Sequence, residues 1–208
     1  MTTHSLSDDD SPEVFTPSIP CRLLESLISL DEIISSFVVL PQCVRPYLKI
    51  IEYLVHGIPW IIISFLAVVI AYSYRWKEEI QYQLLILFIG LILDLAAIGI
   101  LKIVIQRERP PGNIDDQIFE APVADRFSFP SGHTSRGALL ATLGIHFCPP
   151  FLIPVFIILA LLVAYSRVAM GRHFVGDVIA GLALGVALAF AVLCLPRVVS
   201  RWVKRLFV

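Results

Sequence analysis

The stretch "LLILFIGLILDLAAIGILKIVI", residues 84–105, has only two charged side chains in its 22 residues, Asp94 and Lys102. An α-helix needs about 20 predominantly apolar residues to cross a bilayer. We therefore expect a membrane span over residues 83–105. It is followed at once by "QRERP", residues 106–110, which is cationic and ends in proline. Charged groups at the end of a span are costly in lipid and tend to mark function.

The composition extends this expectation to the whole chain. Of its 208 residues, 57% are hydrophobic and 16% are charged, and the mean hydropathy is +0.82. These values exclude an ordinary soluble domain and indicate a multi-span membrane protein of one domain. The formal net charge of −1 gives no reason to expect a nucleic-acid partner. The partner that the composition predicts is the lipid bilayer.

We predict an all-α transmembrane bundle in which direction alternates from one helix to the next. An N-terminal amphipathic helix, within residues 22–42, precedes a shorter helix at about 43–56. The apolar residues of the N-terminal helix recur at helical spacing between acids and serines. This pattern favours a helix lying on the membrane over the alternative of a span. Small residues in the last span favour close helix packing. About five core spans are expected, at residues 58–74, 83–105, 132–147, 151–169 and 175–195.

Three segments follow from composition: a disordered polar tail at residues 1–20, a membrane-embedded domain at 21–196 and a basic tail at 197–208. The first segment lacks the basic and apolar regions of a signal peptide. The basic tail is expected to lie against anionic headgroups. Four scattered cysteines form no zinc or disulfide pattern.

Alternation of the spans places three polar stretches on one membrane face: "KIVIQRERP" (102–110), "PSGHTSR" (130–136) and "SRVAMGRHFVGD" (166–177). These stretches lie at adjoining helix ends, so we expect one pocket. Its candidate residues are Lys102, Arg109, Ser131, Gly132, His133, Arg167, His173 and Asp177.

The cations of this pocket predict a phosphate site. Lys102 and Arg109 are seven residues apart and would share a face of a continuing helix. Arg167 adds a planar donor fork that suits phosphate oxygens. Ser131 is expected to cap the third span and to offer its hydroxyl, and Gly132 lets the backbone approach a ligand closely. The N-terminus of that span favours an anion through its free N–H groups and its dipole.

The two histidines supply reactive groups. Asp177 follows His173 by four residues and can fix its tautomer. The hypothesis is that His173 attacks phosphorus to form a phosphohistidine, while His133 protonates the leaving oxygen and later activates water. The remaining five candidates would stabilise the equatorial oxygens. No carboxylate cluster is evident, so we expect no metal and no other cofactor.

At these residues the chain resembles the type 2 phosphatidic acid phosphatase superfamily. The family pattern is Lys, six residues, Arg-Pro; then Pro-Ser-Gly-His; then Ser-Arg, five residues, His, three residues, Asp. All three motifs are intact here, beginning at Lys102, Pro130 and Ser166, and the resemblance covers roughly residues 22–196. It implies a helical membrane bundle of the type shared with vanadium haloperoxidases, metal-independent dephosphorylation, His173 as nucleophile and His133 as general acid.

Within that family, "HGIPW" (56–60), "LILDL" (91–95) and "SRVAMGRH" (166–173) resemble the branch that hydrolyses polyisoprenoid and presqualene diphosphates. That branch implies presqualene, farnesyl and geranylgeranyl diphosphates or monophosphates as substrates, with residence in the endoplasmic reticulum and nuclear envelope. The alternatives are a broad phosphatase for phosphatidate, lysophosphatidate or sphingosine phosphate, a lipid phosphotransferase, a haloperoxidase, which the composition disfavours, and a non-catalytic scaffold.

Several charged residues keep two interpretations. Asp94 is either a functional partner of Lys102 or a buried structural acceptor. The arginines that flank the motifs are either interfacial anchors or entry-site cations; these are Arg107, Arg126, Arg136 and Arg172. The sidedness of the active face also stays open, because the basic tail and the N-terminal segment point to opposite orientations.

Overall fold

The computed structural model describes residues 19–114 and 126–207, and every regular element within these ranges is helical. The predicted all-α class is therefore confirmed. The long helices are α1 (Ile19–Val38), α2 (Arg45–Leu54), α3 (Gly57–Ser73), α4 (Glu78–Ile105), α5 (Gly132–Phe147), α6 (Ile153–Ala169) and α7 (Val175–Leu193). The short elements are η1 (Gln42–Val44), η3 (Pro150–Leu152), α8 (Val198–Lys204) and η4 (Arg205–Phe207).

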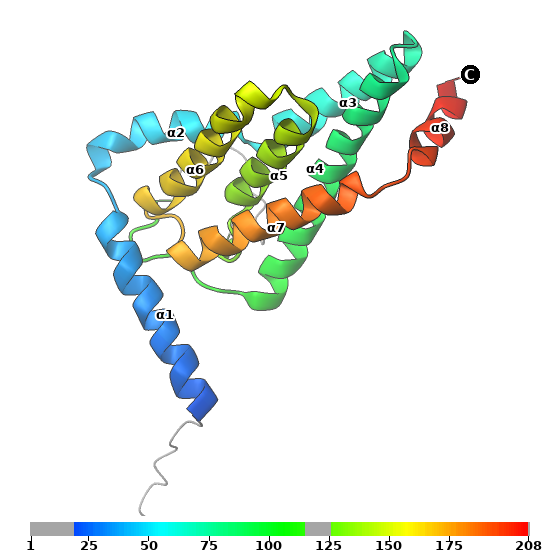
Figure 1. The fold of residues 1–208 in the computed structure, drawn as a ribbon. Coiled ribbons are helices and arrows are strands. Elements are labelled where there is room, and N and C mark those ends of the chain that lie inside the picture. Colours follow the sequence, from blue (N-terminus) through cyan, green and yellow to red (C-terminus); the bar gives the residue numbers. More distant parts are fainter. Residues whose placement is uncertain (1–18, 115–125, 208) are drawn as a thin grey trace, which may run out of the picture.

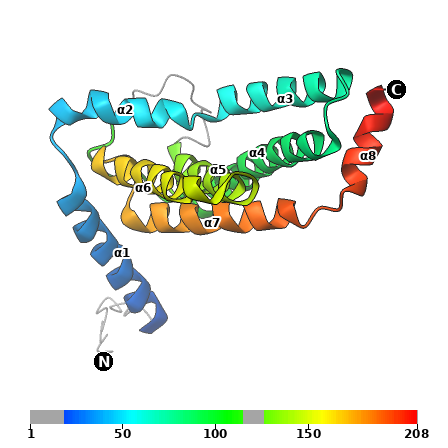
Figure 2. The same cartoon turned by 45° about the horizontal axis from the view of Figure 1, so that its top comes forward.

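Helix α5 is the centre of the bundle and packs against α4, α6 and α7 (Figures 1 and 2). Helix α3 lies along α4, and α2 lies across α6. Helix α1 projects from the end where α7 begins, whereas α8 lies at the other end, beside the start of α4 (Figure 1). Helices α1 and α8 therefore lie at opposite ends of the bundle.

Four segments within the described residues are long and apolar enough to cross a membrane: Gln42–Ser73, Glu78–Ile105, Pro150–Ala169 and Val175–Leu193. They correspond to four of the five expected core spans, of which 58–74 and 175–195 extend one and two residues beyond them. The remaining one, expected at residues 132–147, is α5, whose 16 residues make it shorter than these four. Outward-facing apolar side chains such as Ile62, Leu95 and Ile158 are half exposed, as lipid-facing groups are in a bundle without a surrounding bilayer.

Helix α1 uses its polar face to hold the start of α7. The Gly176 N–H donates to Asp31 Oδ1 at 2.8 Å, and the Val175 N–H donates to Ser35 Oγ at 2.8 Å. These N–H groups belong to the first turn of α7, which has no intrahelical acceptors for them. Among residues 25–38 of α1, most of the other side chains are exposed. The polar face predicted for this amphipathic helix is thus partly a docking surface inside the protein. The tail predicted for residues 1–20 lies outside the described residues, except that α1 begins at Ile19.

Glycines bring α7 against the N-terminal half of α5. A Cβ on Gly181 would lie 2.6 Å from the Ser131 carbonyl oxygen, and one on Gly185 would collide with the Ser135 carbonyl. The Ser131 N–H donates to the Asp177 carbonyl at 3.0 Å. The predicted close packing by small residues is confirmed, and it fixes the start of α5 relative to the start of α7.

The expected continuation of α4 to Arg109 is wrong. The helix ends at Ile105, and its C-cap residue Gln106 has a left-handed φ of 50°. The Gln106 N–H still bonds to the Lys102 carbonyl at 3.0 Å, and the chain then turns away. Lys102 and Arg109 therefore do not share a helix face, and Arg109 lies in the loop after α4.

Candidate active site

The eight predicted residues come from the adjoining ends of α4, α5, α6 and α7. Five of them are at most 4% exposed: Lys102, Ser131, Arg167, His173 and Asp177. Arg167 and Arg109 are close enough to His173 to interact with it electrostatically, and His173 is close enough to His133 to do so. On the α4 side, a Cβ on Gly132 would lie 3.2 Å from the Ile98 side chain, and Ile98 is one helical turn before Lys102. The structure therefore brings the three motifs to one end of the bundle.

The turn between α6 and α7 presents His173. Gly171 has φ +66°, which L-residues with side chains rarely adopt. The Gly171 N–H donates to the Val168 carbonyl at 2.8 Å, and the Arg172 N–H donates to the Arg167 carbonyl at 3.1 Å. This pair of bonds is a Schellman motif, which ends α6 sharply. Arg167, at the last turn of α6, and His173, just beyond it, are thereby directed to the same end.

Asp177 lies beside His173 and is itself held from two sides. Its Oδ2 lies 3.6 Å from His173 Nδ1 and accepts a 2.9 Å hydrogen bond from the Phe174 N–H. Its Oδ1 accepts a 2.8 Å hydrogen bond from Arg107 Nη1. The guanidinium of Arg107 also lies over the Phe174 ring, 4.1 Å from its centroid. Because the carboxylate is on the Nδ1 side, the other ring nitrogen of His173, Nε2, is the one available for chemistry.

Burial is the main reason that His173 is neutral. The pKa of His173 is lowered from 6.5 to about 3, chiefly by loss of hydration. The nearby Arg167 and Arg109 act in the same direction, and Asp177 acts in the opposite one. A neutral imidazole has a free electron pair and is the nucleophilic form. The site without substrate therefore holds this histidine in its reactive protonation state.

Ser131 is the N-cap residue of α5, as predicted, but its hydroxyl does not cap a backbone N–H. It pairs with the Thr134 hydroxyl, 2.9 Å away. His133 follows in the first turn of α5, with its side chain 14% exposed. Its ring lies edge-on to that of His56, with centroids 6.0 Å apart. Two hydroxyls and an imidazole thus gather at a helix N-terminus, where an anion is favoured.

The site also contains charged residues that the sequence motifs did not reveal. Glu52, on α2, is 4% exposed. Its Oε2 lies 3.2 Å from Arg167 Nη1 and 3.3 Å from Arg172 Nη2. Arg172 is fully buried, so it is neither an interfacial anchor nor an exposed entry-site cation. Glu52 was missed because α2 is remote from the motifs; its one available signal is an acid in the apolar run "KIIEYLV", residues 49–55.

Asp94 belongs to a separate buried cluster. Its Oδ1 accepts a 2.5 Å hydrogen bond from Ser135 Oγ, and its Oδ2 lies 3.2 Å from Arg136 Nη2. Arg136 Nη1 also donates to the Val55 carbonyl at 3.3 Å. This supports the interpretation of Asp94 as a structural acceptor, because the cluster ties α4 to α5 and to the end of α2.

Several buried polar atoms of the site lack a hydrogen-bond partner among the described residues, including Arg167 Nε, Arg167 Nη1, His133 Nε2 and His173 Nδ1. Buried donors without acceptors are costly. Donors gathered from α5 and α6 beside a neutral histidine suit an anionic substrate that supplies several oxygens. Within residues 19–114 and 126–207, no three His, Cys, Asp or Glu residues form a possible metal site.

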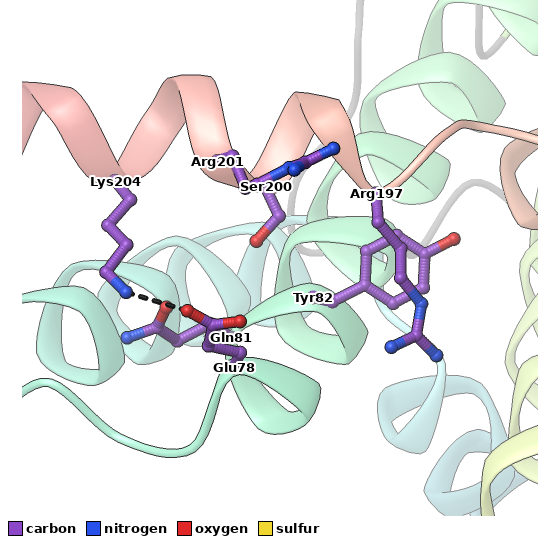
Figure 3. A pocket seen from close by; sticks show the side chains of 7 residues that line it. All are labelled: Glu78, Gln81, Tyr82, Arg197, Ser200, Arg201 and Lys204. Atoms are coloured by element: carbon purple, nitrogen blue, oxygen red, sulfur yellow. Dashed lines mark hydrogen bonds and ion pairs between the residues drawn. The ribbon is translucent and has the colours of Figure 1, made fainter.

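A second polar region lies at the opposite end of the bundle, between α4 and α8 (Figure 3). This cavity of about 260 Å³ contains no histidine, and the Ser200 hydroxyl is engaged with the Tyr72 hydroxyl at 2.7 Å. Glu78 begins α4 and Lys102 lies 24 residues later, roughly 36 Å along the helix axis. The cavity is therefore distinct from the histidine site. Its lining residues are Glu78, Gln81, Tyr82, Arg197, Ser200, Arg201 and Lys204.

Comparison with known proteins shows the family of this chain. The model of the PAP2 superfamily matches residues 83–201. A "Probable lipid phosphate phosphatase beta" from Arabidopsis thaliana is 30% identical over 56% of this chain and 67% of that protein. The "Phosphatidylglycerophosphatase B" of Bacillus subtilis (strain 168) is 32% identical over 79% of this chain and 82% of that protein.

Two crystal structures share the fold. That of the transmembrane PAP2-type phosphatidylglycerolphosphate phosphatase from Bacillus subtilis is 28% identical and aligns with a TM-score of 0.62 over 80% of this chain and 84% of that chain. That of Aquifex aeolicus LpxE aligns with a TM-score of 0.57 at 21% identity, over 80% of this chain and 93% of that chain. The matched family segment contains every predicted site residue. The chain belongs to the PAP2 superfamily and is a membrane phosphatase of that type.

Proposed function

We propose that this protein hydrolyses lipid phosphates at the membrane surface through a phosphohistidine on His173. The observation that carries the proposal is a buried, neutral His173 beside Arg167, with Asp177 on its Nδ1 side and His133 nearby. The names of the plant and bacterial relatives support a lipid phosphate as substrate. Residues 21–196 would form the phosphatase domain, with the lipid tail in the bilayer and the headgroup in the site.

In the first step, His173 Nε2 attacks phosphorus, and the bond between phosphorus and the leaving oxygen breaks. His133, protonated once the phosphate anion is bound beside it, donates this proton to that oxygen. The dephosphorylated lipid therefore leaves as an alcohol, or as a monophosphate when the substrate is a diphosphate. Positive charge on the His173 ring is stabilised by Asp177. The equatorial oxygens would be bound by Lys102, Arg109, Arg167, the Ser131 hydroxyl and the Gly132 N–H.

In the second step, His133, now neutral, takes a proton from water as the water oxygen attacks the phosphohistidine. The bond between phosphorus and Nε2 breaks, inorganic phosphate leaves and His173 returns to its neutral form. Each step has a donor and an acceptor for its proton among these two histidines and water. The reaction as written needs no metal, and activity in excess chelator is its direct test.

For the substrate, we propose a polyisoprenoid diphosphate such as presqualene, farnesyl or geranylgeranyl diphosphate, with residence in the endoplasmic reticulum and nuclear envelope. Support comes from the resemblance of "HGIPW", "LILDL" and "SRVAMGRH" to that branch. The first two segments meet in the buried cluster of Asp94, apart from the histidine site: the Arg136 guanidinium lies 2.8 Å from the position of a Cβ on Gly57, and Asp94 pairs with Arg136. The second candidate is a broader lipid phosphate phosphatase, which the names of the plant and bacterial relatives favour.

The test is phosphate release by the detergent-purified protein in excess EDTA. The substrates are the three isoprenoid diphosphates, phosphatidate and phosphatidylglycerophosphate, with His173→Ala as the control. We expect isoprenoid-selective release that the substitution abolishes. Preference for a glycerophospholipid would overturn the substrate but keep the mechanism. Loss of activity in EDTA with recovery on adding Mg²⁺ would overturn the mechanism, and a product made only with an added alcohol acceptor would identify a phosphotransferase.

A further inference from the structure

Glu52 lies among the residues that, in the proposed function, bind the phosphoryl group of the substrate. Its Oε2 is within 3.3 Å of both Arg167 Nη1 and Arg172 Nη2, and its Oε1 is 3.9 Å from His133 Nε2. One carboxylate therefore spans from an arginine that would bind the phosphoryl oxygens to the histidine that would protonate the leaving oxygen. The following inference rests on that proposed function.

The contacts of Glu52 are ion pairs without good hydrogen-bond alignment. Glu52 Oε2 and Arg167 Nη1 both lack a hydrogen-bond partner among the described residues, although they are only 3.2 Å apart. Arg167 is buried, and the carboxylate supplies a counter-charge that it needs. An incoming oxygen anion with better alignment can take over these donors without breaking a strong hydrogen bond.

Glu52 is also held in place by its helix. Leu48, one turn earlier on α2, packs in a buried cluster with Ala169 and Met170 at the end of α6. Arg45 Nη1 donates to the Met170 carbonyl at 3.1 Å. Because these contacts hold α2 against α6, the Glu52 carboxylate stays beside Arg167. A ligand therefore has to compete with this carboxylate for the Arg167 guanidinium.

We propose that Glu52 is a specificity-determining residue that excludes phosphodiester headgroups from the site. A carboxylate and a phosphodiester each carry one negative charge, so a phosphodiester gains little by replacing Glu52. A terminal phosphate carries about 1.5 to 2 negative charges at pH 7 and has three oxygens for the donors. Ordinary membrane phospholipids are phosphodiesters and greatly outnumber lipids with a terminal phosphate. The Glu52 carboxylate therefore lets the enzyme bind a lipid with a terminal phosphate in the presence of a large excess of phosphodiester lipids.

The test compares Glu52→Gln with the wild type in phosphate release from the best lipid substrate. The soluble competitors are the phosphodiester diethyl phosphate and inorganic phosphate. The lipid competitor is phosphatidylglycerol, and an equal mole fraction of nonionic detergent serves as its dilution control. We expect wild type to be inhibited by inorganic phosphate but hardly by either phosphodiester. In Glu52→Gln, the inhibition constant of diethyl phosphate should fall about tenfold, because a repulsive charge a few ångströms away is removed.

Glu79→Gln is the matched control, since it removes the same charge from an exposed ion pair with Arg197 at the other end of the bundle. It should leave all inhibition constants unchanged. An unchanged or higher constant for diethyl phosphate in Glu52→Gln would overturn the inference, a higher one showing that Glu52 positions the arginines. If Glu52→Gln does not fold, Glu52→Asp serves instead: its shorter carboxylate should admit diethyl phosphate with a smaller gain, and no gain overturns the inference. Wild type that releases no phosphate from any lipid would overturn the proposed function together with it.

Discussion

Arg107 Nη1 donates to Asp177 Oδ1 at 2.8 Å, while Nη2 of the same guanidinium lies 2.8 Å from Asp31 Oδ2. One side chain thus joins the carboxylate behind His173 to the N-terminal helix α1. The sequence motifs leave Arg107 between two interpretations, and the structure assigns it a third. We predict that Arg107 is a positioning residue that acts through Asp177.

Replacing Arg107 with glutamine should weaken both catalysis and the docking of α1. A charged hydrogen bond contributes roughly 1.5–3 kcal/mol, so the free energy of unfolding should fall by about that amount. We expect kcat to decrease by about tenfold with little change in KM, because Asp177 would be less well held. The measurements are phosphate release and thermal unfolding in detergent. Arg126→Gln, in the same loop and exposed, should change neither; equal effects of the two substitutions would contradict this assignment.

The packing of α5 against α7 predicts a contrast between two glycines. Gly181→Ala should lower stability and activity, because its Cβ would lie 2.6 Å from the Ser131 carbonyl and would push the start of α5 away. Gly99→Ala should be neutral or stabilising by up to about 1 kcal/mol, since nothing lies within 4 Å and alanine favours a helix. Thermal unfolding and phosphate release of both variants test this. Wild-type activity in Gly181→Ala would show that α5 tolerates the shift.

The cluster of Asp94 and Arg136 predicts a stability effect that a double substitution relieves. Asp94→Leu leaves the buried guanidinium without its carboxylate and should cost about 3–5 kcal/mol of stability. Asp94→Leu combined with Arg136→Met removes both charges and should recover most of that loss. The comparison is made by unfolding of the two variants and of wild type. If the double variant is no more stable than the single one, the ion pair is not the source of the effect.

The low pKa of His173 predicts how stability depends on pH. Its pKa in the folded protein, about 3, is below the ordinary value of 6.5. The unfolded chain therefore binds the proton more readily between these values, and stability falls as pH decreases below 6.5. The slope reaches about 1.4 kcal/mol per pH unit.

In practice, the melting temperature of wild type should fall between pH 6.5 and 5 more steeply than that of His173→Gln, which cannot take up this proton. Melting curves of the two proteins in the same detergent and buffers give the comparison. Parallel pH profiles would mean that His173 is protonated as easily in the folded protein as in the unfolded chain.

The helical membrane fold and the gathering of the three motifs could be predicted from the amino-acid sequence alone. Long apolar runs leave few alternatives, because a backbone in lipid has to satisfy its hydrogen bonds internally. Alternating helix direction then puts the stretches around Lys102, His133 and His173 at one end of the bundle. Such inferences need only the order and length of the segments, which a sequence contains.

Which charges face one another could not be predicted in this way, because it depends on the packing of the helices. Glu52 lies 115 residues before Arg167 in the chain, and Asp31 lies 76 residues before Arg107, yet both pairs are in contact. The left-handed turn at Gln106 removes Arg109 from the helix of Lys102, which the seven-residue spacing did not indicate. Pairings of this kind depend on how α1 and α2 pack across α6 and α7, because contact between side chains is set by the relative placement of helices rather than by the periodicity within one.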